Sequence, residues 1–108
     1  MAVIDDLILR RARAALSVIA RQARVRAAFL FGSYVEGEPD EFSDIDIAAF
    51  VEGAGQWGLT RRVEAAVEAQ REVGDDIELH FFAAELLENP PKASFAAYVQ
   101  SHGVPIDI

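Results

Sequence analysis

The chain has 108 residues, 52% of them apolar, which is enough for one folded domain spanning residues 1–108 around one modest core. It contains no cysteine, so disulfides, thiolate metal sites and cysteine nucleophiles are excluded. A formal net charge of −8 argues against direct binding to nucleic acid. We expect a cytoplasmic protein, because the sequence shows neither the pattern of a signal peptide nor an apolar stretch long enough to cross a membrane.

The first part of the chain predicts a helix, a strand and a tight turn. Residues 3–24 have apolar side chains at helical spacing and no Gly or Pro, which predicts an amphipathic helix. The short apolar run 26–31, closed by Gly32, predicts a mostly buried strand. Residues 33–37 predict a helical turn, capped by Ser33, whose first N–H groups are free to bind phosphate.

The arginines of this first part have two interpretations. Residues 1–26 contain six of them: Arg10, Arg11, Arg13, Arg21, Arg24 and Arg26. They form a solvated helix face, or some of them meet an acidic partner or a nucleotide phosphate.

The second part alternates strands and helices. Strands are expected at 44–51 and 77–82, with a helix at 57–73 between them. A shorter helix at 93–101 follows a proline break, and residues 104–106 are expected as an edge strand, because proline cannot donate to a sheet. This order predicts an α+β fold of two layers, in which helices cover one face of a small mixed sheet and leave the other face open.

Two aspartates interrupt one of these apolar strands. Asp44 and Asp46 are two residues apart, so alternation places both side chains on the same face. Strands disfavour Asp, and two parallel carboxylates repel each other unless a cation neutralises them. Carboxylate oxygens are the ligands that Mg²⁺ accepts, together with water and substrate phosphates.

These residues belong to a longer motif. Gly32-Ser33, followed after ten residues by Asp44-Ile45-Asp46, resembles the GS-x10-DxD signature of the minimal nucleotidyltransferases, small members of the DNA polymerase β-like superfamily. Gly37 stands where that family has its second glycine, and residues 43–48 resemble its strand motif. The resemblance covers nearly the whole chain, including the closing residues 103–106.

The resemblance implies transfer of a nucleoside monophosphate, AMP from ATP, to a hydroxyl group, with pyrophosphate leaving. Two Mg²⁺ ions are implied, held by Asp44 and Asp46. The Ser33 hydroxyl and the backbone N–H groups after Gly32 would hold the terminal phosphates. Tyr34 stands where many members have Arg, so an Arg contact to phosphate is missing there. The Tyr34 ring either stacks on a ligand or is simply exposed on the surface.

The family's third carboxylate lies on the next strand, where this chain has Glu78 in place of Asp. In that role Glu78 would bind the metal at the attacking hydroxyl and help to accept the proton of that hydroxyl. Whether the longer side chain of Glu supports full activity stays an open question at this point. Asp76 has the same parity and is the alternative third ligand. His80 also shares this face, but a lone histidine beside two phenylalanines is more often structural.

The acceptor is expected to be a protein, because a chain of this size has little left to enclose a second substrate. The resemblance extends to antitoxins whose partner is a helical HEPN-type toxin, and it implies adenylylation of a tyrosine or similar hydroxyl of that toxin. A homodimer remains open.

Two other functions compete with this one. A catalytically weak module that binds nucleotide or metal could neutralise its partner by contact alone. Transfer to a small molecule would require acidic pocket walls, which the exposed-loop candidates Glu36, Glu38, Asp40 and Glu41 could supply.

Overall fold

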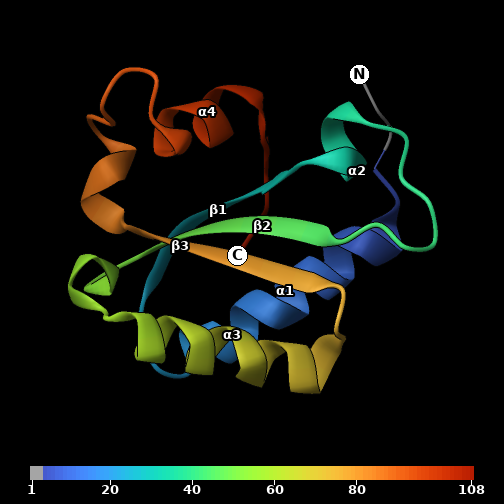
Figure 1. The fold of residues 1–108 in the computed structure, drawn as a ribbon, viewed down its shortest axis with the longest axis horizontal. Helices are drawn as coiled ribbons and strands as arrows, with labels where there is room; N and C mark the ends of the chain where they lie inside the picture. Colours follow the sequence, from blue (N-terminus) through green and yellow to red (C-terminus); the bar gives the residue numbers. More distant parts are fainter. Residues whose placement is uncertain (1–3) are drawn as a thin grey trace.

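A four-stranded mixed sheet forms the centre of the molecule (Figure 1). The computed structural model describes residues 4–108. The strands lie in the order β3-β2-β1-β4, with β1 antiparallel to both of its neighbours and β2 parallel to β3. Their bounds are Val25–Phe31 for β1, Ile45–Val51 for β2, Ile77–Ala83 for β3 and Val104–Pro105 for β4.

Helices connect the strands and cover the sheet. Within residues 4–108 the α-helices are α1 Asp6–Ala20, α2 Ser33–Glu36, α3 Leu59–Val73 and α4 Phe95–His102, and the short 3-10 helices are η1 Ala54–Gln56 and η2 Ala84–Leu87. The parallel strands β2 and β3 are joined through α3, because a parallel pair requires a crossover connection. The antiparallel strands β1 and β2 are joined through the short α2 and the loop that follows it.

The main core lies between one face of the sheet and the two long helices, α1 and α3 (Figure 1). In β2 the residues of this face are fully buried, as the alternation of a strand requires: Ile45, Ile47, Ala49 and Val51. The inner stripe of α1 packs against them and is buried to the same degree: Ala12, Ala15, Leu16 and Ile19. The aspartate of β2 therefore has to face the other side of the sheet.

That other side is covered only in part. Phe50 is fully buried there, with Phe82 stacked on it at 5.0 Å and Phe29 edge-on at 5.7 Å between ring centroids. Helix α4 packs on this aromatic cluster through Ala96 and Val99. Figure 1 shows α4 on the opposite side of the sheet from α3.

The α+β fold class with a small mixed sheet is confirmed, and one feature is added to it. The two long helices lie on one face as expected, whereas α4 and η2 lie on the face that was expected to stay open. The reason is that Phe50 of β2 and Phe82 of β3 project from this face and leave a large apolar area that must be covered. The acidic end of this face stays open, since the Glu78 side chain there is 49% exposed.

The element boundaries differ from the sequence expectation by a few residues. Helix α1 begins at Asp6, where the Asp5 carboxylate accepts a 2.8 Å hydrogen bond from the N–H of Leu7, and it ends at Ala20 rather than 24. The expected helix start at residue 3 lies outside the described residues. Within 4–108, no helix combines the length and the apolar character that a membrane crossing requires.

Candidate active site

The open end of the sheet brings three chain segments together. Asp46 pairs in register with Glu78 on the parallel neighbour β3 and with Phe31 at the end of the antiparallel neighbour β1. Because Phe31 is followed directly by Gly32, the turn into α2 begins beside Asp46. The predicted carboxylates and the predicted glycine turn therefore lie at one place in the fold.

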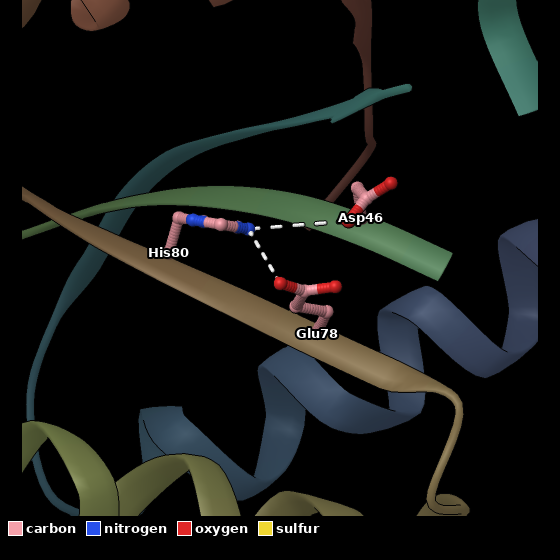
Figure 2. Close-up of side chains that lie close together, drawn as sticks. All are labelled: Asp46, Glu78 and His80. Atoms are coloured by element: carbon pink, nitrogen blue, oxygen red, sulfur yellow. Dashed lines mark ion pairs between the residues drawn. The ribbon is translucent and has the colours of Figure 1, made fainter. Parts of the chain in front are cut away.

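Three side chains converge at this place (Figure 2). Asp46, Glu78 and His80 each offer one potential metal-ligand atom, and these atoms lie within 4.8 Å of one another. The His80 Nε2 atom is 3.6 Å from Glu78 Oε1 and 3.9 Å from Asp46 Oδ1. All three residues have even numbers and project from the face opposite α1 and α3.

Asp44 lies beside this group but is not part of it. It is exposed and precedes β2, which begins at Ile45. The loop before it is held by its own contacts, since the Ser43 hydroxyl accepts a 2.9 Å hydrogen bond from the N–H of Asp40. The Asp44 charge nevertheless contributes to the potential at Asp46, as the pKa of that residue shows.

The carboxyl of Asp46 has an abnormal pKa. Burial raises it most, followed by the charge of Glu78, a hydrogen bond shared with Glu78 and the charge of Asp44, and together they raise the pKa of Asp46 to about 6. Three acidic side chains thus gather at a point where the Asp46 carboxyl is partly shielded from water. A divalent cation would remove this repulsion, so the electrostatics of the site favour binding of one.

Gly32 is required by both its conformation and its surroundings. Its φ of +80° and ψ of −149° lie in a region that is essentially restricted to glycine. A Cβ atom at this position would collide with Asp46 Oδ2 and lie 3.1 Å from Asp46 Cγ. The absence of a side chain at residue 32 therefore leaves room for the Asp46 carboxylate.

The turn after Gly32 presents backbone N–H groups near these acids. The Gly32 carbonyl accepts 2.9 Å hydrogen bonds from the N–H groups of Val35 and Glu36, which closes α2. The N–H groups of Ser33 and Tyr34 belong to the first turn, where a helix offers no internal acceptor. Gly32, not Ser33, is the N-cap residue, so the predicted capping by the Ser33 side chain is wrong.

Tyr34 has a partly structural role. Its side chain is half-buried and packs against the main core rather than standing free on the surface. Gly37 closes the turn through a 3.1 Å hydrogen bond from its N–H to the Ser33 carbonyl, and a Cβ there would lie 3.1 Å from Ser33 Cα. Close packing within the turn therefore explains the second glycine.

Asp76 is not a third ligand, and this alternative is corrected by the structure. The Arg11 guanidinium binds both oxygens of its carboxylate, at 2.7 Å from Nη1 to Oδ2 and at shorter range from Nη2 to Oδ1. Arg11 holds the pKa of the Asp76 carboxyl below its usual value. Asp76 precedes β3, which begins at Ile77, so strand parity does not apply to it.

The other arginines near the N-terminus are largely paired within the chain. Arg10 pairs with Asp6, Arg21 with Glu72 and Arg26 with Glu52, which favours the solvated-face interpretation for them. Arg13 and Arg24 instead border a hollow of about 560 Å³ between α1 and β1. This hollow contains none of the carboxylates described above, so its size alone does not identify it as the reactive site.

His80 joins the two carboxylates, although the sequence placed it on this face only as a structural residue. Its ring lies edge-on to Phe31 at 5.2 Å and to Phe95 at 5.7 Å between centroids, as a structural histidine would. Its Nε2 atom, however, is buried, faces the two carboxylates and has no hydrogen-bond partner within residues 4–108. The available signal was its i+2 spacing from Glu78, which places both on one face of β3.

The donor set fits a divalent cation. The Asp46 carboxyl with its raised pKa, the neighbouring Glu78 carboxylate, a buried nitrogen without a partner and the space left by Gly32 surround one point. Asp46, Glu78 and His80 could each supply one ligand atom, and Asp44 is near enough to contribute charge.

Comparison with known proteins agrees with this geometry. A family model described as "Polymerase beta, Nucleotidyltransferase" matches residues 15–102, a range that contains every residue of the site. No curated protein matches the chain.

Proposed function

Because the chain belongs to the polymerase β nucleotidyltransferase family, we propose that it transfers AMP from ATP to a hydroxyl group of a protein. The acceptor oxygen attacks the α-phosphorus, a new P–O bond forms, and the bond to the bridging α,β-oxygen breaks, so that pyrophosphate leaves with that electron pair. The acceptor proton passes to a base. The observation that carries the proposal is the acid pair Asp46 and Glu78 directly beside the Gly32 turn.

Each residue of the site has a distinct role in this proposal. Asp44, Asp46 and Glu78 would hold Mg²⁺, and a bound Mg²⁺ would supply positive charge to the triphosphate and to the attacking oxygen. The N–H groups of Ser33 and Tyr34 orient the terminal phosphates at the start of α2. Glu78, whose side chain is 49% exposed against 21% for Asp46, is accessible to an incoming acceptor and to its proton.

A protein acceptor is supported by the surroundings of the site. β3 is an edge strand, and a hollow of about 390 Å³ along it is bordered by Val63, Leu79, Phe82 and Phe95 as well as by His80. Half or nearly half of the Val63 and Phe95 side chains is exposed. An apolar partner surface docked here would bring a hydroxyl to Glu78, and a helical HEPN-type toxin with an accessible tyrosine is the partner we propose.

The test is a mass measurement on the partner. The chain is mixed with ATP, Mg²⁺ and the product of the neighbouring gene, and a gain of one AMP on that product is expected. Asp44→Asn combined with Asp46→Asn should abolish the gain. Glu64→Gln is the matched control, because it removes one exposed carboxylate from α3, on the opposite side of the sheet. Absence of any AMP adduct with the wild-type chain would contradict the proposal.

A second function, neutralisation of a partner by contact alone, is favoured by one observation. The exposed apolar side chains on α3, Leu59 at 78% and Val63 at 51%, form a surface that does not depend on the carboxylates. The same double variant separates the two functions in a growth assay. Protection that persists without Asp44 and Asp46 supports contact, and protection that disappears supports transfer.

A further inference from the structure

His80 is held in place by aromatic packing and cannot readily turn away from the acids. Phe31 and Phe95 lie edge-on against its ring from β1 and α4. The side chain is 32% exposed, yet the Nε2 atom itself is shielded from solvent. The nitrogen therefore remains directed at Asp46 and Glu78 (Figure 2).

The distances at this nitrogen are too long for hydrogen bonds. Nε2 lies 3.6 Å and 3.9 Å from the nearest carboxylate oxygens, beyond the range in which a hydrogen bond forms. A buried polar atom without a hydrogen-bond partner is destabilising. The structure thus keeps an atom in an unfavourable environment beside two negative groups.

These separations are instead those of atoms that share a cation. Two metal-ligand bonds of about 2.0–2.2 Å each span up to about 4 Å, which covers both distances from Nε2. Mg²⁺ takes oxygen ligands almost exclusively, whereas imidazole nitrogen is a favourable ligand for Zn²⁺ and other transition metals. The nitrogen therefore distinguishes this donor set from one made of carboxylates alone.

We propose that His80 Nε2 joins Asp46 and Glu78 in a mixed nitrogen and oxygen site that, besides Mg²⁺ on the carboxylates, also binds Zn²⁺ through the imidazole. This deepens the proposed function, since it concerns the same site. It does not require that transfer occurs, because binding of the ion can be measured without nucleotide.

The experiment compares two metals and two histidines. Zn²⁺ affinity is measured by competition with a chromophoric chelator, and Mg²⁺ affinity by calorimetry, both without ATP. His80→Phe removes the nitrogen and keeps an aromatic ring between Phe31 and Phe95, whereas His102→Asn removes the other histidine of the chain, which lies on α4 with its Nδ1 3.2 Å from the Tyr98 carbonyl.

We expect His80→Phe to weaken Zn²⁺ binding by at least about tenfold and to change Mg²⁺ binding by less than about threefold. His102→Asn should leave both affinities unchanged. Equal effects on the two metals, or no effect of His80→Phe on Zn²⁺, would overturn the proposal.

A measurement on the unmodified chain guards against a variant that fails to fold. In ¹⁵N NMR spectra of the wild-type protein, the His80 Nε2 resonance should shift when one equivalent of Zn²⁺ is added, and that of His102 should not. An unchanged His80 resonance would overturn the proposal. Zn²⁺ binding through His80 without AMP transfer would support this inference and contradict the proposed function. AMP transfer together with Zn²⁺ binding that does not depend on His80 would support the proposed function and overturn this inference.

Discussion

Replacement of Gly32 by alanine tests whether the glycine turn and the acid pair form one unit. An L residue at φ +80° and ψ −149° is strained by about 1–3 kcal/mol. The new Cβ would in addition collide with Asp46 Oδ2 and lie 3.1 Å from Cγ, so the carboxylate has to move away from Glu78 and His80. We therefore expect Gly32→Ala to lose stability and metal binding together.

The chain offers a matched control at Gly53. Its φ is +83°, close to that of Gly32, but a Cβ there would meet no atom within 4 Å. Gly53→Ala should carry only the backbone strain, about 1–2 kcal/mol, and bind metal as the wild type does. Gly32→Ala should bind Mn²⁺ at least about tenfold more weakly.

Urea unfolding and calorimetric titration with Mn²⁺ provide the two readouts. For a domain of this size each kcal/mol lost lowers the melting temperature by about 4 °C, so a thermal melt distinguishes the two variants as well. The reasoning would be refuted if Gly32→Ala bound Mn²⁺ with wild-type affinity and were no less stable than Gly53→Ala.

Three further predictions concern charge and hydrogen bonding. The pKa of Asp46 is raised to about 6, against about 3.9 in an unfolded chain, so ionisation of Asp46 destabilises the folded state as the pH rises from about 4 to 6. Asp46→Asn should therefore raise the free energy of unfolding of the metal-free protein by about 1–3 kcal/mol at pH 8 and leave it unchanged below pH 4. Arg11 lowers the pKa of Asp76, so the ion pair stabilises the folded state above about pH 4, and this stabilisation is lost as the pH falls through the pKa of Asp76 in the folded protein. Asp76→Asn should lower the free energy of urea unfolding by about 1 kcal/mol at pH 7, after allowance for solvent screening, and an equal loss at pH 2 would contradict this pairing. The Arg62 guanidinium donates to three backbone carbonyls at 2.7, 2.7 and 3.3 Å, and Arg62→Gln should lower the free energy of unfolding by about 2 kcal/mol; an unchanged urea midpoint would show that water replaces these contacts.

The order of elements and the position of the acids could be predicted because both depend on local pattern. Apolar spacing identifies α1 and α3, and alternation places Asp46 and Glu78 on the face away from them. The spacing between Gly32 and Asp46 identifies a family, and the structure shows the physical reason, since the glycine leaves the space that the carboxylate needs.

Features that depend on contacts between distant segments could not be predicted. The pairing of Arg11 with Asp76 joins α1 to the turn before β3, and parity alone made Asp76 a plausible ligand. Asp44 was expected inside the strand, but β2 begins one residue later, at Ile45, and the Asp44 side chain is exposed to solvent. The orientation of His80 depends on Phe31 and Phe95, which belong to other elements.

A crystal structure with Mg²⁺ and a non-hydrolysable ATP analogue tests the central claim most directly. We expect a metal ion in contact with Asp46 and Glu78, and the triphosphate against the N–H groups of Ser33 and Tyr34. A nucleotide found only in the hollow beside Arg13 and Arg24, or no bound nucleotide at saturating concentration, would contradict the assignment of the Asp46 site as the reactive centre.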